Sequence, residues 1–391
     1  MKPAARIAAA IDVLDAVIAG EAAEKVLTSW ARRNRYAGSG DRATVRDHVF
    51  DALRRRRSYG WLGGADSGRG LMLGALRALG SDPAEFFTGE KYAPAQLTVS
   101  ERCTRELSTA PRAVRLDFPD WMIPELTTSM GHDLEAVALV MQHRAPVFLR
   151  VNTARVDRAE AARRLAADGI VTKPVNLSHT ALEITDGPRK LRHSDAYRDG
   201  LVEPQDVASQ AVVDFLPKAS RILDYCAGGG GKSLALAARR GCKVYAHDVD
   251  PVRMRDLPVR AARADADVAP LDAAGVKRAA PFDLVLCDAP CSGSGSWRRS
   301  PDAKWRLDQD RLTELMRLQA GILAQASNLV SAGGYLAFAT CSLLHCENRD
   351  NTAKFLAAHT CWKLVTEHSF SPLDGGDGFY VAVLTRIDQH A

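Results

Sequence analysis

The second half of the chain alternates short apolar runs with segments of helical spacing, from residue 221 to residue 385. The run Leu284–Cys287 contains no polar side chain, which is typical of a strand that is buried on both faces. Strands that alternate with helices form a parallel sheet with right-handed crossovers, so we predict a doubly wound α/β domain. Its strands are expected at residues 221–226, 242–248, 267–272, 282–288, 334–340, 362–367 and 378–385, and its helices at residues 232–240, 251–264, 311–331 and 347–359.

Two further regions precede this domain. Residues 1–130 carry apolar side chains at helical spacing, such as Ile7, Leu14 and Ile18, and we expect a small helical domain there. Residues 131–205 contain expected strands at 146–152 and 169–174 and a helix at 159–168, which suggests a small α+β linking subdomain. A helix at residues 206–216, capped by Asp206, then begins the doubly wound domain of residues 206–391.

The basic residues of the chain suggest a polyanionic partner. The formal net charge of +5 is by itself weak evidence for one. The longest basic run is Arg54–Arg57. It fits either a solvated helix end, where cations complement the helix dipole, or a phosphate-binding face, and the sequence leaves both interpretations open.

The eight cysteines include no CxxC pair and no regular spacing. This argues against a zinc site or a disulfide framework and favours reduced thiols. Asp12 and Asp15 interrupt the first apolar stretch, so no signal peptide is indicated, and no apolar run reaches membrane-spanning length. We therefore expect a cytoplasmic protein without bound metal, and a monomer by default.

Two of the expected strands each run into a short polar turn. Asp288 and Cys291 follow the strand 282–288, and Cys341 follows the strand 334–340. Open α/β sheets bind ligands at the carboxyl ends of their strands, so two thiols and a carboxylate meet in one pocket if these strands are neighbours. The remaining apolar-flanked cysteines are interpreted as small buried side chains, namely Cys226, Cys242, Cys287 and Cys361.

The first and second strands of the domain end in residues suited to a nucleotide-like ligand. The glycines Gly228–Gly231 let a ligand approach the backbone and the helix that begins at Lys232, although a plain structural turn is the alternative. Their spacing matches neither a phosphate loop nor a GxGxxG dinucleotide turn. An acid after the second strand suits the hydroxyls of a ribose, and we expect Asp248 to bind there and Asp250 to cap the next helix.

Several motifs in combination resemble one protein family. They are DYCAGGGGKS, AHDVDPVR, FDLVLCDAPCSGSG and FATCS, with LRVN, EPQDVASQ, RRSPDAKW and DGFYVAVL elsewhere. Together they resemble the RsmB-type (Sun family) RNA cytosine-5 methyltransferases, over about residues 140–386. The resemblance implies a Rossmann-like class I methyltransferase domain that uses S-adenosyl-L-methionine. Residues 1–130 are similar to the NusB-like helical RNA-binding domain of bacterial members.

The resemblance also implies roles for individual residues. Cys341 would be the nucleophile, Cys291 would assist release of the product, and Asp288 would hydrogen-bond the base, with Lys232 at the cofactor and base site. The implied cofactor-binding residues are Cys226, Ala227, Gly228, Gly229, Gly230, Gly231, Lys232, Asp248, Arg253, Asp272 and Asp288. Asp272 is chosen over the nearby Asp265 and Asp267 as the acid after the third strand. The chain departs from the family where Gly228 replaces a proline and Ser233 a threonine.

The implied reaction has a chemical reason, and rival functions remain. C5 of cytosine is a poor nucleophile until a thiolate adds to C6, so the enzyme needs a cysteine. The expected substrate is ribosomal RNA of the small subunit, with transfer RNA second, and the target base must be unstacked. Arg298, Arg299 and Arg306 are either contacts to its backbone or an exposed basic loop. The alternatives are a nicotinamide-dependent oxidoreductase, an RNA-binding ribosome-assembly factor without catalysis, and protein or nitrogen methylation, which commonly uses a different turn after this strand.

Overall fold

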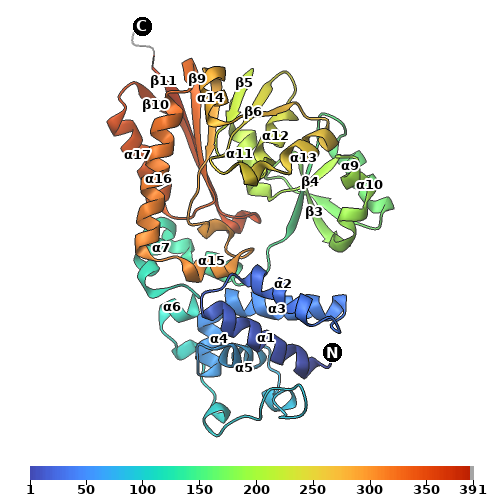
Figure 1. Cartoon of the computed structure of the whole chain (residues 1–391). Coiled ribbons are helices and arrows are strands. Elements are labelled where there is room, and N and C mark those ends of the chain that lie inside the picture. Colours follow the sequence, from blue (N-terminus) through green and yellow to red (C-terminus); the bar gives the residue numbers. More distant parts are fainter. Residues whose placement is uncertain (388–391) are drawn as a thin grey trace. The chain divides into compact units, whose positions relative to one another are not determined.

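The computed structural model describes residues 1–387 and divides the chain into two compact units. One unit consists of Met1–Arg144 and Trp297–Asp308, and we call it the helical unit. The other consists of Ala145–Ser296 and the residues from Gln309 onward, and we call it the sheet unit. The helical unit is therefore built from two separate stretches of sequence (Figure 1).

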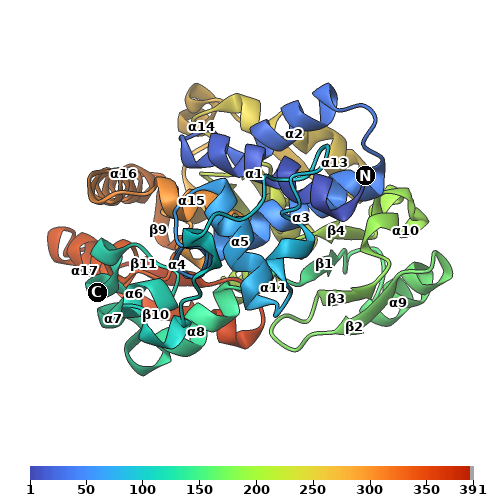
Figure 2. The same cartoon turned by 90° about the horizontal axis from the view of Figure 1, so that it is seen from below.

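The helical unit contains a group of helices around α1, α3 and α5, which lie side by side (Figures 1 and 2). Its helices are α1 Pro3–Ile18, α2 Ala23–Arg33, α3 Ser39–Arg54, α4 Arg56–Gly63, α5 Gly68–Ala78, α6 Arg112–Arg115, α7 Ile123–Met130, α8 Leu134–Met141 and α15 Pro301–Arg306. The predicted helical character of the first 130 residues is confirmed.

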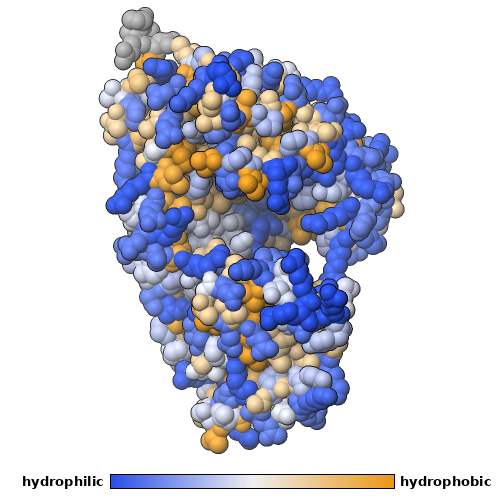
Figure 3. Space-filling view, in the orientation of Figure 1, coloured by the Kyte–Doolittle hydropathy of each residue, from blue (hydrophilic) through white to orange (hydrophobic). Residues whose placement is uncertain are grey.

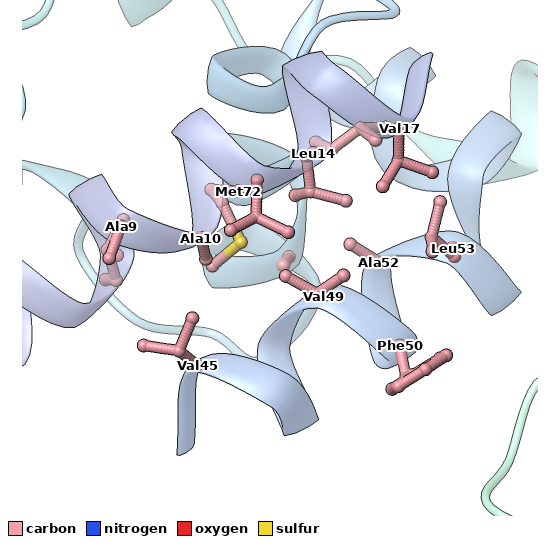
Figure 4. Close-up of a cluster of buried hydrophobic side chains, with 14 of the residues drawn as sticks. Ala9, Ala10, Leu14, Val17, Val45, Val49, Phe50, Ala52, Leu53 and Met72 are labelled. Atoms are coloured by element: carbon pink, nitrogen blue, oxygen red, sulfur yellow. The ribbon is translucent and has the colours of Figure 1, made fainter. Parts of the chain in front are cut away.

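The core of the helical unit follows from the apolar stripes of these helices. Leu14 of α1, Val49 and Leu53 of α3 and Met72 of α5 are almost fully buried and point toward one another (Figure 4). Each such side chain contributes about 1.5–3 kcal/mol when it is taken out of water. The stripe that predicted these helices is thus the surface that holds them together.

In the basic run Arg54–Arg57, Arg54 is buried and the other three arginines are partly exposed. Helix α3 ends at Arg54 and α4 begins at Arg56, so the run lies between two packed helices. Arg54 is buried, and its Nε donates to the carbonyl of Arg298 at 2.6 Å. The other arginines also bind partners: Arg55 the Gln142 carbonyl, Arg56 the Asp66 carboxylate and Arg57 the Asp120 carboxylate.

The segment Trp297–Asp308 packs into the helical unit through buried side chains. Trp297 is 2% exposed, and Lys304 is buried with its Nζ donating to the Arg54 carbonyl at 3.2 Å. Arg298 is 3% exposed, so the prediction that its side chain holds RNA is wrong. Arg306 is half exposed and pairs with Asp302 at 3.1 Å.

The sheet unit is organised around a seven-stranded sheet of order β10-β11-β9-β8-β5-β6-β7. Neighbouring strands from β9 to β7 run parallel, whereas β11 is antiparallel to both β9 and β10. The strands are β5 Arg221–Asp224, β6 Lys243–Ala246, β7 Val268–Pro270, β8 Phe282–Asp288, β9 Val330–Thr340, β10 Trp362–Phe370 and β11 Phe379–Arg386. The helices are α11 Val207–Phe215, α12 Gly231–Ala237, α13 Leu257–Ala264, α14 Ala273–Ala279, α16 Gln309–Ser327 and α17 Arg349–Ala358.

Both faces of this sheet are covered. In β8, Leu284 and Leu286 join the apolar cluster that includes α11 and α12. Val285 and Cys287 point the other way, into the cluster that includes α16 and α17. This explains the apolar run without polar alternation, and the predicted doubly wound, Rossmann-like fold is confirmed.

A second, four-stranded sheet precedes the large one in the sheet unit. Its strand order is β2-β3-β1-β4, and all neighbouring pairs are antiparallel. The strands are β1 Val147–Val151, β2 Val171–Pro174, β3 Ala181–Asp186 and β4 Val202–Pro204, with helices α9 Arg158–Ala167 and α10 Asp195–Arg198 (Figure 2). β1, α9 and β2 were predicted, whereas β3 and β4 were not.

Several boundaries differ from the prediction for local reasons. The expected helix 251–264 is a 3₁₀ turn, η7 Pro251–Met254, followed by α13, because Pro258 lacks an N–H and fits only the first turn of a helix. Helix α16 ends at Ser327, and β9 begins at Val330. The short helix α14 was not predicted.

Hydrophilic residues cover most of the face shown in Figure 3, with apolar residues scattered among them. Among residues 1–387, none of the helices combines the length and the apolar character that crossing a bilayer requires.

Candidate active site

The two thiols selected from the sequence lie together at the carboxyl ends of adjacent strands. β8 and β9 pair in parallel, with Asp288 opposite Ala339. Cys291 and Cys341 follow these strand ends, and their sulfur atoms are 3.4 Å apart. The two strands are therefore neighbours, which is the condition under which the sequence predicted that the two thiols lie close together.

The two sulfurs are not equivalent. The hydrogen bond with the Cys341 sulfur, followed by burial and the charge of Glu347, raises the pKa of the Cys291 thiol well above its usual value. Cys291 therefore keeps its proton at neutral pH and can donate it to the sulfur of Cys341.

A buried ion pair lies at the same end of the sheet. Lys232, near the start of α12, places its Nζ 2.7 Å from Oδ2 of Asp288, the last residue of β8. The Lys232 side chain is 6% exposed, and its Nζ lies 4.8 Å from the centre of the Phe379 ring. The pair fixes the Asp288 carboxylate while leaving it partly open to solvent, with 31% of that side chain exposed.

The glycine loop between β5 and α12 has a backbone that requires glycine. Gly228 and Gly230 have φ angles of +52° and +78°, in the left-handed region. The N–H of Gly228 donates to Oδ2 of Asp248 at 2.8 Å, and Arg253 pairs with the same oxygen at 3.3 Å. Asp248 is thus held against the loop by Gly228 and Arg253.

The acids that follow the second and third strands have distinct contacts. Asp250 caps η7 by accepting from the N–H of Val252 at 3.1 Å, which confirms the predicted cap. Asp272 follows β7 and caps α14 by accepting from the N–H of Gly275 at 2.6 Å. Its role toward a cofactor remains a prediction.

Asp224 also lies at this end of the sheet, although the sequence did not single it out. It ends β5 and is 1% exposed. Its Oδ2 accepts from the Ser233 hydroxyl at 2.6 Å, whereas Oδ1 is buried without a partner. Burial is the main cause that raises the pKa of Asp224 to about 7. A buried acceptor without a donor, next to the glycine loop, fits the amino group of a bound ligand.

Two arginines donate hydrogen bonds to backbone carbonyls of the glycine loop. Arg150 of β1 is buried and donates to the carbonyl of Gly231 at 2.6 Å. Arg260 of α13 donates to the carbonyl of Gly229 and pairs with Glu203 of β4 at 3.0 Å. The motifs LRVN and EPQDVASQ contain Arg150 and Glu203, whereas Arg260 lies outside all the motifs, and the structure shows that these residues support the loop.

Cys226 lies in the same loop but is unsuited to nucleophilic attack. Burial is the largest cause that raises the pKa of its thiol, and the nearby carboxylates of Asp224, Asp288 and Asp248 add to it. Among residues 1–387, no group of three or more His, Cys, Asp or Glu side chains is arranged to hold a metal ion.

Behind the two thiols lies a buried carboxylate that the sequence analysis missed. Glu347, in the 3₁₀ turn η9 His345–Glu347, has no exposed surface and accepts hydrogen bonds from Ser292 and Ser342. Its only sequence signal was an acid a few residues after a strand-end cysteine.

The sheet order and the site define the class of this protein. Six strands run in one direction, and β11 lies antiparallel between β9 and β10. With a glycine loop after β5, they form the Rossmann-like fold of a methyltransferase. Comparisons with known proteins agree. The family model described as 16S rRNA methyltransferase RsmB/F matches residues 215–385, and a model for the ferredoxin-like domain of RsmF/B-like proteins matches residues 118–189.

Relatives cover most of the chain. The ribosomal RNA small subunit methyltransferase B of Xanthomonas campestris pv. campestris is 33% identical over 352 residues, which is 81% of this chain and 79% of that protein. The protein of the same name from Vibrio cholerae is 33% identical over 294 residues, which is 71% of this chain and 68% of that protein. The chain belongs to the RsmB/F family of rRNA methyltransferases.

Solved structures share the fold. The crystal structure of PH0851 has a TM-score of 0.77 at 24% identity, and the match covers 98% of this chain and 99% of that one. A methyltransferase homolog from Pyrococcus horikoshii has a TM-score of 0.61 at 22% identity and covers 70% of this chain and 97% of that one.

Proposed function

We propose that this enzyme transfers a methyl group from S-adenosyl-L-methionine to C5 of a cytosine in small-subunit ribosomal RNA, through a covalent adduct between Cys341 and C6. The observation that carries the proposal is the pair of sulfur atoms 3.4 Å apart, beside the Asp288–Lys232 ion pair. Family membership and the names of the relatives support a ribosomal RNA substrate.

The first step would activate the base. The Cys341 thiolate forms a bond to C6, and the electrons of the C5=C6 double bond move into the ring and make C5 nucleophilic. Asp288 would hydrogen-bond the ring near N3 and stabilise the adduct. The Lys232 ammonium, 2.7 Å from the Asp288 carboxylate, would hold that carboxylate in place.

The second step would complete the reaction. When bound, S-adenosyl-L-methionine supplies an electrophilic methyl group on a sulfonium. After C5 has received the methyl group, a base removes the C5 proton, the C5=C6 double bond forms again and the bond from C6 to sulfur breaks. Cys341 leaves as a thiolate. Cys291, which keeps its proton and lies 3.4 Å from that sulfur, would assist this release.

The residues around the glycine loop fit the cofactor. The free oxygen of Asp224 suits its amino group, and the carboxylate of Asp248 suits its ribose hydroxyls. The residues that we propose to hold it are Asp224, Cys226, Ala227, Gly228, Gly229, Gly230, Gly231, Lys232, Asp248, Arg253, Asp272 and Asp288. The three-domain division at residues 130 and 205, the monomeric state and the cytoplasmic location also remain predictions.

The test is transfer from methyl-labelled S-adenosyl-L-methionine to small-subunit RNA that lacks the modification. The expected label is in C5 of cytosine. Cys341→Ala should lower methyl transfer by at least about 10³-fold, because it removes the thiol that forms the proposed adduct. Cys291→Ala should accumulate a protein–RNA adduct that survives a denaturing gel. The matched control is Cys103→Ala, which removes an exposed thiol of the helical unit.

Free RNA and assembling small subunits should be offered in parallel. Label on another atom, or full activity of Cys341→Ala, would exclude the adduct mechanism. Cofactor binding without transfer to either substrate would favour the assembly-factor alternative.

A further inference from the structure

The buried carboxylate of Glu347 receives donors on both oxygens. Oε1 accepts from the N–H of Ser292 at 2.8 Å and from Nε2 of Gln319 at 3.0 Å. Oε2 accepts from the hydroxyls of Ser292 and Ser342, the latter at 2.5 Å. An ionised carboxylate can be buried at tolerable cost only when its lone pairs are matched in this way.

The two serines have a special position in the sequence. Ser292 directly follows Cys291, and Ser342 directly follows Cys341. One oxygen of Glu347 therefore joins the two residues next to the two thiols, although Glu347 itself does not hydrogen-bond either sulfur.

Further hydrogen bonds tie the same two loops together. The Ser294 hydroxyl accepts from the N–H of Leu343 at 2.8 Å and lies 3.0 Å from the Ser342 hydroxyl. Gln319 of α16, which donates to Glu347, also donates to the carbonyl of Pro290 at 2.9 Å. The turns after β8 and β9 thus form one polar network centred on the carboxylate.

Burying a carboxylate in order to join two loops costs desolvation free energy. Apolar side chains of the same volume usually stabilise a buried site as well as an ionic group does, or better. A carboxylate at this place is therefore better explained by the geometry that it imposes on the loops than by stability.

We propose that Glu347 is the positioning residue of the two thiols, which holds the Cys291 and Cys341 turns at one separation through Ser292 and Ser342. This inference rests on the proposed function, in which both sulfurs act on the same base. A displacement of about 1 Å from the reactive geometry can cost on the order of 10²-fold in rate.

Glu347 has a second effect on the pair. The groups that act on the Cys291 thiol are the Cys341 sulfur after β9, the Glu347 carboxylate of η9 and the N–H of Gly293. The negative charge of Glu347 helps to keep Cys291 protonated. Its removal should therefore shift the titration of Cys291 to lower pH.

The test compares the full-length wild type with Glu347→Gln. The matched control is Glu314→Gln on α16, where the side chain is 60% exposed. The first measurement is the rate at which iodoacetamide alkylates Cys291 and Cys341 between pH 6 and 10, followed peptide by peptide in a mass spectrometer without RNA or cofactor. The second is kcat and KM for RNA methylation.

We expect Glu347→Gln to alkylate Cys291 at least about threefold faster at pH 8, with a profile displaced to lower pH. We expect kcat to fall about 10- to 100-fold while KM for RNA changes less than about threefold. The control should match the wild type in every measurement.

An unchanged Cys291 profile in a folded Glu347→Gln protein would overturn the proposal, even if that protein melts at a lower temperature. If Glu347→Gln does not fold, as judged by circular dichroism, Ser342→Ala and Ser292→Ala replace it. Each should shift the Cys291 alkylation profile and kcat in the same direction by a smaller amount. If neither variant changes the Cys291 profile, the proposal is overturned. Because alkylation needs no RNA, a wild type that methylates no cytosine would reject the proposed function while the thiol measurements still decide the role of Glu347.

Discussion

Asp224 combines a structural cost with a proposed binding role. Its carboxylate is buried with one oxygen unpaired, and burial raises its pKa from 3.8 to about 7. Between these two values the folded protein binds a proton that the unfolded chain does not. The stability that the wild type has below pH 4 is therefore progressively lost as the pH rises toward 7.

Asp224→Asn should remove this loss, because asparagine carries no charge and can still accept from Ser233. We expect the variant to gain at least about 1 kcal/mol over the wild type at pH 7.5 and much less at pH 4.5. Urea unfolding at the two pH values measures the difference. The affinity for S-adenosyl-L-methionine should fall in the same variant, and a variant that binds it as tightly as the wild type would remove Asp224 from the proposed site.

The role of a single residue was predictable where it depends on the residues next to it in the sequence. Asp250 precedes Pro251 at a helix start, and it caps the turn as expected. Arg54 and Arg298 were not predictable, because the carbonyl that Arg54 binds lies 244 residues away in the sequence. Glu347 was missed for the same reason, since its serine partners come from two separate turns.

At the scale of elements, the segment that carries α15 is anchored by a buried cation. Lys304 lies near Asp117, and burial lowers the pKa of Lys304 to about 8 and raises that of Asp117 to about 6. Asp117 has no exposed surface and also accepts from Ser58 and Gln142. Charge attraction between Lys304 and Asp117 opposes both shifts.

Lys304→Met should leave the Asp117 charge buried without this cation. We expect a loss of about 2–4 kcal/mol in the free energy of unfolding of the helical unit at pH 7. The loss should shrink at pH 5, where Asp117 can take up a proton. Urea unfolding followed by tryptophan fluorescence measures it. The half-exposed Arg306, changed to Met, is the control and should lose less than about 1 kcal/mol; equal losses in both variants would contradict the anchoring role of Lys304.

The small sheet supports the glycine loop through Arg150. Burial lowers the pKa of Arg150 to about 10, so it remains charged at neutral pH. In the proposed reaction, Arg150→Met should raise KM for S-adenosyl-L-methionine about tenfold with little change in kcat, since a hydrogen bond from a charged donor is worth about 1.5–3 kcal/mol. Steady-state kinetics test this, with the exposed Arg163→Met of α9 as control. A large fall in kcat at constant KM would assign Arg150 another role.

Elements were predictable where burial is complete on both sides. β8 and the second half of β9 are apolar runs. The alternation of strands with helices predicted the doubly wound sheet but not its strand order. β3 and β4 were not predicted from the sequence. Ala181–Asp186 is buried at only half of its positions, and Val202–Pro204, with three residues, is too short for a periodic pattern. Their pairing with β1 is decided by contacts that are distant in sequence.

At the scale of the whole molecule, the helical unit includes Trp297–Asp308, which is flanked on both sides by the sheet unit in the sequence. A chain of residues 145–391 alone would carry this segment, with the apolar surface of Trp297, away from its core. We expect that truncated chain to aggregate. The same chain with residues 297–308 replaced by a Gly/Ser linker should stay soluble and keep its secondary structure. Size-exclusion chromatography and circular dichroism compare the two, and identical behaviour would show that the segment does not need the helical unit.

The interrupted course of the helical unit also concerns its synthesis on the ribosome. The amino-terminal part of a protein emerges first, and a domain that is continuous in sequence can fold while the rest is still being made. Here the first 144 residues cannot pack against Trp297–Asp308 until all of residues 145–296 have been translated. The first region to leave the ribosome is therefore completed only after most of its neighbour has already appeared.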